Sequence, residues 1–231
     1  MPESSDPAVR VRETTSGREL RVSGTLASLY RPGQATTGLI WDALAAPLTL
    51  LPAERRRAVL ILGLGGGSAA RVVRALAPAA RIVGVERSAA VVEAARRHLD
   101  LDALRIEVNV DDARAFLARG GDPFDAVLED VFEGGTHTLR KPAWLLADGL
   151  VQAARMLVPG GLLVSNTIGQ AHEVTRALKA VWPRVAWIGT RDYENRMVVG
   201  GAAMEARALR RAVAAEPLFD EVRPRLTYRT V

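Results

Sequence analysis

The sequence contains no cysteine, so disulfides and thiolate metal sites are excluded. Its lysines are Lys141 and Lys179, and the other basic residues are arginines. Aromatic residues make up 5% of the chain and do not interleave with the arginines, so no stacking platform for nucleic acid is expected. No apolar run approaches the roughly 20 residues that span a bilayer. We therefore expect neither a membrane nor a nucleic acid as partner.

The composition that remains is typical of a globular protein: 231 residues, 48% hydrophobic and 25% charged. The net charge is +5, but the arginines are scattered in pairs, as on solvated helix faces. The first residues lack the basic and apolar regions of a secretory signal, so a cytoplasmic location is expected. The histidines show no metal-ligand spacing, and no metal is expected.

Residues 18–30 alternate between apolar and polar and are broken by Gly24, which predicts a small N-terminal β-hairpin. Residues 33–51 predict a helix interrupted near Pro47. Residues 1–17 are expected to be frayed or extended. We divide the chain into an N-terminal extension with hairpin and lead-in helix at residues 1–52, and a nucleoside-binding catalytic domain at residues 53–231.

From residue 58 onward, short apolar runs alternate with amphipathic stretches. Runs typical of buried strands cover residues 58–63, 81–86, 104–110, 124–130, 162–167, 184–189 and 195–202. Stretches with helical spacing cover residues 68–78, 88–100, 112–120, 141–158 and 173–182. This alternation predicts a doubly wound, Rossmann-like α/β fold with a mainly parallel seven-stranded sheet, whose last two strands form a hairpin. The tail after residue 203 is predicted to be helical and then irregular.

The corner between the first of these strands and the first helix holds Gly63, Gly65, Gly66 and Gly67. Glycine permits positive φ and a close approach of the backbone to a ligand. The helix that follows begins near Ser68 and offers free N–H groups and the positive end of its dipole. A tight structural turn is the alternative explanation, because a glycine pattern alone is weak evidence for a nucleotide site.

Acidic residues follow the next strands, where ligands of such sheets bind. Glu86 ends the second strand, and its carboxylate suits the hydroxyls of a ribose; pairing with Arg87 is the alternative. Asp111 and Asp112 end the third strand and suit an adenine amino group, whereas Asp112 also suits an N-cap.

Three further acids, Glu129, Asp130 and Glu133, end the fourth strand. Clustered carboxylates repel one another unless a cation sits among them. Acids would also repel the diphosphate of a dinucleotide, whereas adenosylmethionine carries a sulfonium cation and an amine. The pattern therefore favours a sulfonium nucleoside over a nicotinamide dinucleotide. A solvated loop is the alternative explanation for the acids.

At these residues the sequence resembles the class I adenosylmethionine-dependent transferases, and among them the spermidine synthase-like group of aminopropyltransferases and methyltransferases. The resemblance covers roughly residues 20–170. It rests on the segments VLILGLGGGSAARVV, RIVGVERSAAVVEAARRHL, IEVNVDDARAFL, FDAVLEDVFEGG and MLVPGGLLVSN.

The resemblance implies a role for each matching residue. The cofactor positions are Gly63, Gly65 and Gly67 for the amino-acid end, Glu86 for the ribose, and Asp112 with Ala113 for the adenine. Asp130 matches the carboxylate that helps to deprotonate the attacking amine, and Glu133 matches a second acid. Gln34 matches a glutamine that contacts the cofactor from the hairpin side.

Two departures from the aminopropyltransferase pattern bear on the reaction. Their glycine loop carries an aspartate where this chain has Gly66, and their polyamine-binding helix carries a tyrosine, a glutamate and a histidine. Here the corresponding helix is TTGLIWDALAAPL, with Asp42 as its only charge. The form GLGGGS is closer to that of the methyltransferase-like members.

We therefore expect methyl transfer from adenosylmethionine to an unidentified small-molecule acceptor, for which the acidic rim favours a cationic amine. Aminopropyl transfer from decarboxylated adenosylmethionine to a diamine is the first alternative, and a non-catalytic nucleoside-binding protein is the second. A nicotinamide-dependent oxidoreductase is less favoured, because of the strand-end acids. His137 is expected in a glycine-hinged loop after the fourth strand, as a mobile residue or a substrate contact. The apolar helices and the late hairpin are compatible with a homodimer.

Overall fold

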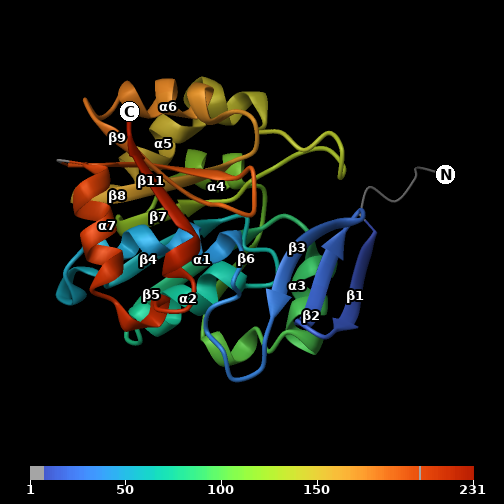
Figure 1. The fold of residues 1–231 in the computed structure, drawn as a ribbon. Helices are drawn as coiled ribbons and strands as arrows, with labels where there is room; N and C mark the ends of the chain where they lie inside the picture. The colour runs from blue at the N-terminus through green and yellow to red at the C-terminus, as the bar shows by residue number, and fades with distance from the viewer. Residues whose placement is uncertain (1–7, 203) are drawn as a thin grey trace.

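The computed structural model describes residues 8–202 and 204–231. Its centre is an eight-stranded sheet with the strand order β11-β9-β10-β8-β7-β4-β5-β6 (Figure 1). The strands are β4 (Ala58–Leu62), β5 (Arg81–Glu86), β6 (Glu107–Val110), β7 (Phe124–Glu129), β8 (Leu157–Thr167), β9 (Val185–Thr190), β10 (Arg196–Gly201) and β11 (Leu226–Thr230). Strands β4 to β8 pair in parallel, and β10, β9 and β11 add antiparallel. The predicted doubly wound α/β fold is confirmed.

Alternate residues of the central strands belong to two hydrophobic clusters, one on each face of the sheet. In β4, Val59 and Ile61 belong to one cluster, and Leu60 and Leu62 to the other. Because successive side chains of a strand point to opposite faces, both faces must be covered by helices. The helices that contribute to the first cluster are α1 (Ile40–Ala45), α2 (Ser68–Leu76), α3 (Ala89–His98) and α7 (Ala206–Ala214). Those that contribute to the second are α4 (Ala113–Arg119), α5 (Leu150–Arg155) and α6 (Ala171–Lys179).

The strand order reverses between β4 and β7. The chain runs outward from β4 through β5 to β6 and then returns to place β7 on the other side of β4. At such a switch point the loops after two neighbouring strands diverge and leave a crevice at the carboxyl ends of the strands. The glycine corner after β4 and Asp130 after β7 flank this crevice.

A second sheet precedes the first in the chain. It is antiparallel, with the order β1-β2-β3, and consists of β1 (Val9–Thr14), β2 (Gly17–Val22) and β3 (Thr25–Tyr30). The hairpin predicted for residues 18–30 is β2 and β3. The expectation that the residues before it are frayed or extended is wrong for β1, where Val9 and Val11 pack against the core cluster. Residues 1–7 lie outside the described residues.

The end of the chain also differs from the expectation. Helix α7 is present, but Leu226–Thr230 is not irregular: it pairs antiparallel with β9 and makes the sheet eight-stranded. The predicted break near Pro47 is present as a 3-10 turn, Ala46–Leu50, that follows α1. Among the described residues, none of the helices combines the length and the apolar character that a bilayer crossing requires. The division at residues 52 and 53 stays a prediction.

Candidate active site

The glycine corner brings the loop after β4 against the loop after β7. Gly63 has a φ of +80°, and a Cβ there would lie 2.7 Å from the carbonyl oxygen of Asp130. Gly65 has a φ of +54°, and its N–H donates a 3.0 Å hydrogen bond to Oε2 of Glu86. A side chain at Gly63 would therefore collide with the Asp130 backbone and force the two loops apart.

Gly66 and Gly67 serve packing within the protein. The Gly66 N–H donates to Oγ of Ser28 on β3 at 2.7 Å, and a Cβ at Gly66 would lie 2.7 Å from Cδ2 of Leu99. A Cβ at Gly67 would lie 2.7 Å from Cδ1 of Leu101. Neither glycine lines the cavity described below, so the structural-turn explanation holds for this half of the loop.

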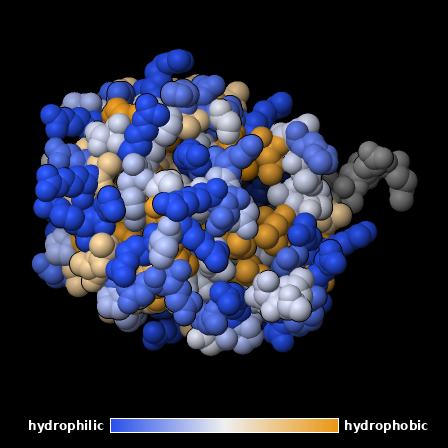
Figure 2. Space-filling model, in the orientation of Figure 1, coloured by the Kyte–Doolittle hydropathy of each residue, from blue (hydrophilic) through white to orange (hydrophobic). Residues whose placement is uncertain are grey.

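A cavity of about 380 Å³ lies beside Gly63 and Gly65, between the two sheets. Figure 2 shows the surface hollowed there, with apolar residues along the hollow. A smaller compartment of about 160 Å³ adjoins it. The residues that line both compartments are Gly63, Glu86, Arg87, Asp130 and Phe132. The first cavity is within the size range of small-molecule sites.

Glu86 sits at the end of β5 where the two compartments meet. Its Oε1 accepts a 3.1 Å hydrogen bond from the Ser88 N–H, and its Oε2 accepts the bond from Gly65. Ser88 also caps α3, as expected from the sequence. No ion pair joins Glu86 to Arg87 among the described residues. A carboxylate has about four acceptor sites, so Glu86 retains capacity for ligand hydroxyls.

The smaller compartment contains Asp111, Asp112 and Ala113 at the end of β6. Oδ1 of Asp112 accepts hydrogen bonds from the backbone N–H groups of Arg114 and Ala115 at 2.9 and 3.1 Å, so Asp112 caps α4. Asp112 therefore fills the structural role weighed for it and also lines the compartment. Asp111 is paired with Arg119, and the hydrogen bond from this guanidinium lowers the pKa of Asp111.

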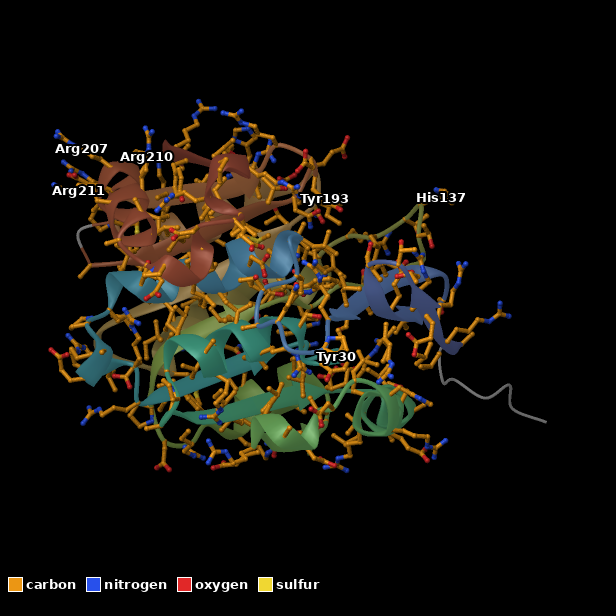
Figure 3. The ribbon with its side chains drawn as sticks, turned by 60° about the horizontal axis from the view of Figure 1, so that its bottom comes forward. Tyr30, His137, Tyr193, Arg207, Arg210 and Arg211 are labelled. Atoms are coloured by element: carbon orange, nitrogen blue, oxygen red, sulfur yellow. The ribbon has the colours of Figure 1, made fainter. Side chains whose placement is uncertain are left out.

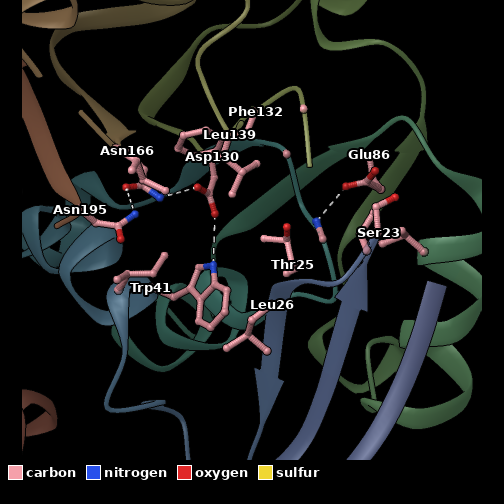
Figure 4. Close-up of a pocket in the computed structure, with 18 of the residues that line it drawn as sticks. Ser23, Thr25, Leu26, Trp41, Glu86, Asp130, Phe132, Leu139, Asn166 and Asn195 are labelled. Carbon is pink, nitrogen blue, oxygen red and sulfur yellow. Dashed lines mark hydrogen bonds between the residues drawn. The ribbon is translucent and has the colours of Figure 1, made fainter. Parts of the chain in front are cut away.

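Asp130 follows β7 and faces the cavity (Figure 4). Oδ2 accepts a 3.1 Å hydrogen bond from Nε1 of Trp41, and Oδ1 accepts a 2.7 Å bond from Nδ2 of Asn166. Burial raises the pKa of Asp130 to about 6, while the charge of Lys141 opposes the rise. A carboxyl group with this pKa is deprotonated at neutral pH and is a better proton acceptor than an ordinary aspartate.

The neighbouring acid, Glu129, is fully buried and paired with Lys141. The Lys141 Nζ lies 2.8 and 2.9 Å from the two Glu129 carboxylate oxygens, and neither side chain is exposed. The ammonium also donates to the Val131 carbonyl at 3.0 Å and lies 4.0 Å from the centre of the Phe132 ring. The cation expected among the clustered acids is therefore Lys141, and the pair anchors the loop that follows Asp130.

Two predicted site residues lie apart from Asp130 and the larger cavity. Glu133 forms a 3.0 Å ion pair with Arg140 and lines only the smaller compartment. Gln34 is exposed, and neither compartment includes it. Their assigned roles stay predictions that this geometry does not support.

The loop from Phe132 to Arg140 bends over the turn between β2 and β3. The hydroxyls of Thr136 and Thr25 are 3.2 Å apart, and Gly134 and Leu139 line the cavity. His137 is exposed at the outer end of this loop, away from the cavity (Figure 3). The loop therefore closes one side of the cavity.

The sequence analysis missed part of the polar lining of the cavity. Trp41 was expected in the core, and although it is only 5% exposed, its indole N–H reaches Asp130. Asn195 donates a 2.9 Å hydrogen bond to Oδ1 of Asn166, which extends the chain of hydrogen bonds from Asp130 (Figure 4). The missed contact of Trp41 spans 89 residues, and no local pattern signals it.

Comparison with known proteins agrees with this architecture. Residues 59–161 match the family model described as a methyltransferase domain. A polyamine aminopropyltransferase of Mycobacterium tuberculosis is 38% identical over 146 residues, which cover 59% of this chain and 27% of that protein. The chain thus spans less than a third of the length of the curated relatives that it matches first.

Two solved structures show the same fold. A probable spermidine synthase from Corynebacterium glutamicum superposes with a TM-score of 0.71 at 20% identity and covers 98% of this chain and 88% of its own. Human methyltransferase-like protein 13, solved in complex with SAH, superposes with a TM-score of 0.66 at 24% identity and covers 76% and 89%. With the family match and this topology, the chain belongs to the class I adenosylmethionine-dependent transferases, in their spermidine synthase-like group.

Proposed function

We propose that this protein transfers a methyl group from adenosylmethionine to the nitrogen of a small amine, with Asp130 as the proton acceptor. The observation that carries the proposal is the position of Asp130. Its backbone packs on Gly63 of the nucleoside loop, and its carboxylate faces the apolar cavity. A proton acceptor is thereby held where the nucleoside site and the acceptor space join.

The residues at the crevice fit a sulfonium nucleoside. Glu86 has acceptor sites for the ribose hydroxyls, and the compartment at Asp112 and Ala113 offers a place for the adenine. Gly63 and Gly65 present backbone to the amino-acid end. Of the described lining residues of both compartments, only Arg87 is cationic, so little positive charge is present to attract a diphosphate.

The residues of the chain then act by position and charge. Adenosylmethionine, when bound, supplies a methyl group on a cationic sulfur, whose bonding electron pair stays with the sulfur as the methyl group moves to nitrogen. Asp130 accepts the proton that the nitrogen loses, and Trp41 and Asn166 hold its two oxygens in place. The apolar walls exclude water and strengthen the attraction between the carboxylate and a cationic amine.

Aminopropyl transfer to a diamine is the second proposal, because a polyamine aminopropyltransferase is among the relatives. Gly66 speaks against it. The family places an aspartate there, but in this chain a Cβ would lie within 3 Å of both Leu99 and Ser28. A non-catalytic nucleoside-binding protein would leave the raised pKa of Asp130 without a role.

The test is turnover with adenosylmethionine and, separately, with its decarboxylated form, in the presence of a panel of small amines. Mass spectrometry of the acceptor distinguishes a methyl from an aminopropyl adduct. We expect a methyl adduct only, and about a 100-fold or greater loss of rate in Asp130→Asn, the usual contribution of a general base. An aminopropyl adduct, or full activity in Asp130→Asn, would contradict the proposal. Glu133→Gln is the matched control and should retain activity.

We propose the cytoplasm as the setting and a small molecule, not a nucleic acid, as the acceptor. The exposed arginines of α7, Arg207, Arg210 and Arg211, project from the molecule away from the cavity (Figure 3), as on a solvated helix face. A homodimer is a further proposal, which size-exclusion chromatography with light scattering tests.

A further inference from the structure

We infer that the acceptor is a small apolar monoamine and that the site selects against diamines. This inference rests on the proposed function and adds the chemical class of its acceptor. The evidence is the lining of the larger cavity beyond the nucleoside positions. Its apolar residues are Leu26, Leu39, Ile40, Trp41, Phe132, Leu139 and Ile168, and its neutral polar ones include Asn166, Tyr193 and Asn195.

Charge in this part of the cavity is confined to a single group. Among the described residues that line the larger cavity, the charged ones are Glu86, Arg87 and Asp130. Glu86 and Arg87 are adjacent at the end of β5, where the nucleoside would bind. Asp130 is therefore the carboxylate that faces the acceptor, and it suits one ammonium nitrogen.

The other nearby acids are occupied elsewhere. Glu129 is buried under Lys141 and does not line the cavity. Glu133 is paired with Arg140 outside the larger cavity. Asp42 is buried, and its oxygens accept hydrogen bonds from Thr37 and from the Gly38 N–H. No described carboxylate remains for a second ammonium group.

The hydrogen bonds around Asp130 also limit what the amides can offer. Asn166 donates to Asp130 and accepts from Asn195, so both of its amide ends are engaged. The distal end of the acceptor therefore meets apolar side chains and neutral amides. An alkyl or aryl group is favoured there, whereas an unpaired ammonium group would lose its hydration without compensation.

The size of the cavity points the same way. Its volume of about 380 Å³ holds the amino-acid end of the cofactor as well as the acceptor. Little room is left for a long polyamine, and a compact amine fits. The specificity therefore comes from the absence of a second anionic contact and from the limited volume.

The test compares hexylamine with hexamethylenediamine, which have the same carbon chain. At a pH above the Asp130 pKa, the wild-type chain should methylate hexylamine with a kcat/KM about tenfold or more above that for the diamine, because the second ammonium is unpaired. An equal or higher kcat/KM for the diamine would overturn the inference. Hexanol serves as the acceptor without a nitrogen.

A designed variant tests the charge argument directly. Leu139→Asp places a second carboxylate on the cavity wall, and Leu139→Asn is the control of the same shape without charge. We expect the diamine to gain on hexylamine by about tenfold in the aspartate variant relative to the asparagine variant. The same preference for hexylamine in both variants would contradict the inference.

Failure of the proposed function is distinguishable from failure of this inference. Calorimetric binding of adenosylmethionine, measured first, tests the nucleoside site alone. If no amine is methylated, binding of the two amines in the presence of adenosylhomocysteine decides the inference. Tighter binding of hexylamine supports it, and tighter binding of the diamine, or binding of neither amine, overturns it.

Discussion

The indole N–H of Trp41 donates a 3.1 Å hydrogen bond to Oδ2 of Asp130, across 89 residues of sequence. Trp41 lies on α1, before the glycine corner, and Asp130 follows β7. The bond joins the lead-in helix to the strand end where the chemistry is proposed. With the bond from Asn166 to the other oxygen, it holds the carboxylate toward the cavity.

The pH dependence of transfer should report the pKa of Asp130. Because burial raises that pKa to about 6 and the base form is the active one, kcat/KM should fall as the pH drops through about 6. Trp41→Phe removes a hydrogen bond to the charged form, so the midpoint should rise by about one unit. Stopped assays across the pH range measure both. A midpoint that does not move in Trp41→Phe would show that the indole does not tune Asp130.

Folding stability should carry the same signature. The pKa of Asp130 is higher in the folded chain than its ordinary value of 3.8, so the folded state binds the proton more tightly. The associated stability is present below pH 3.8 and is lost as the pH rises through about 6. Asp130→Asn lacks this loss. Its free energy of unfolding, relative to wild type, should therefore improve over that window by up to about 3 kcal/mol.

Urea denaturation at several pH values checks this expectation. Glu133→Gln is the control, because Glu133 is partly exposed and paired with Arg140 at the surface. A difference between Asp130→Asn and wild type that is constant with pH would contradict the assigned pKa.

The buried ion pair of Lys141 and Glu129 should be costly to break from one side. Lys141→Met leaves the Glu129 carboxylate buried without a cation, which destabilises a fold by about 3–5 kcal/mol. The double variant Lys141→Met with Glu129→Leu removes both charges and should recover most of that loss. Arg140→Gln breaks an exposed pair and should cost less than about 1 kcal/mol.

Chemical denaturation of these three variants measures the coupling. Lys141→Met should also move the pH midpoint of activity upward, because the Lys141 charge lowers the pKa of Asp130. Equal stabilities of Lys141→Met and Arg140→Gln would show that the pair is not buried as described.

Gly66→Asp tests why the aspartate of the aminopropyltransferases is missing. A Cβ at this position would lie 2.7 Å from Leu99 Cδ2 and 2.9 Å from Ser28 Cβ. We expect a loss of stability of about 1–3 kcal/mol, as in overpacked cores, and no binding of decarboxylated adenosylmethionine. Gly66→Ala separates the steric effect from the charge. Tight binding of the decarboxylated cofactor by Gly66→Asp would reopen aminopropyl transfer as the ancestral or latent reaction.

Regular hydrophobic patterns made the central fold predictable. Buried strands such as β4 are continuous apolar runs, and their order follows from right-handed crossovers. The third N-terminal strand and β11 were missed. In β1 the valines alternate with arginines, which masks the strand pattern, and β11 has only Leu226 fully buried.

The candidate site was predictable where it depends on strand ends. Glu86, Asp112 and Asp130 all reach the crevice, because parallel strands end at one edge of the sheet. Trp41 and Lys141 were not predictable as partners of specific acids, since their contacts depend on how distant segments pack. Gln34 shows the limit of transferring a role through a flexible loop, for it lies outside both compartments.

The most direct test of the account is calorimetric titration with adenosylmethionine, compared with reduced nicotinamide dinucleotide. We predict saturable binding of adenosylmethionine, weakened about tenfold or more in Glu86→Gln, because the amide offers one acceptor oxygen in place of two. The dinucleotide should not bind. Binding of the dinucleotide with no heat from adenosylmethionine would contradict the account.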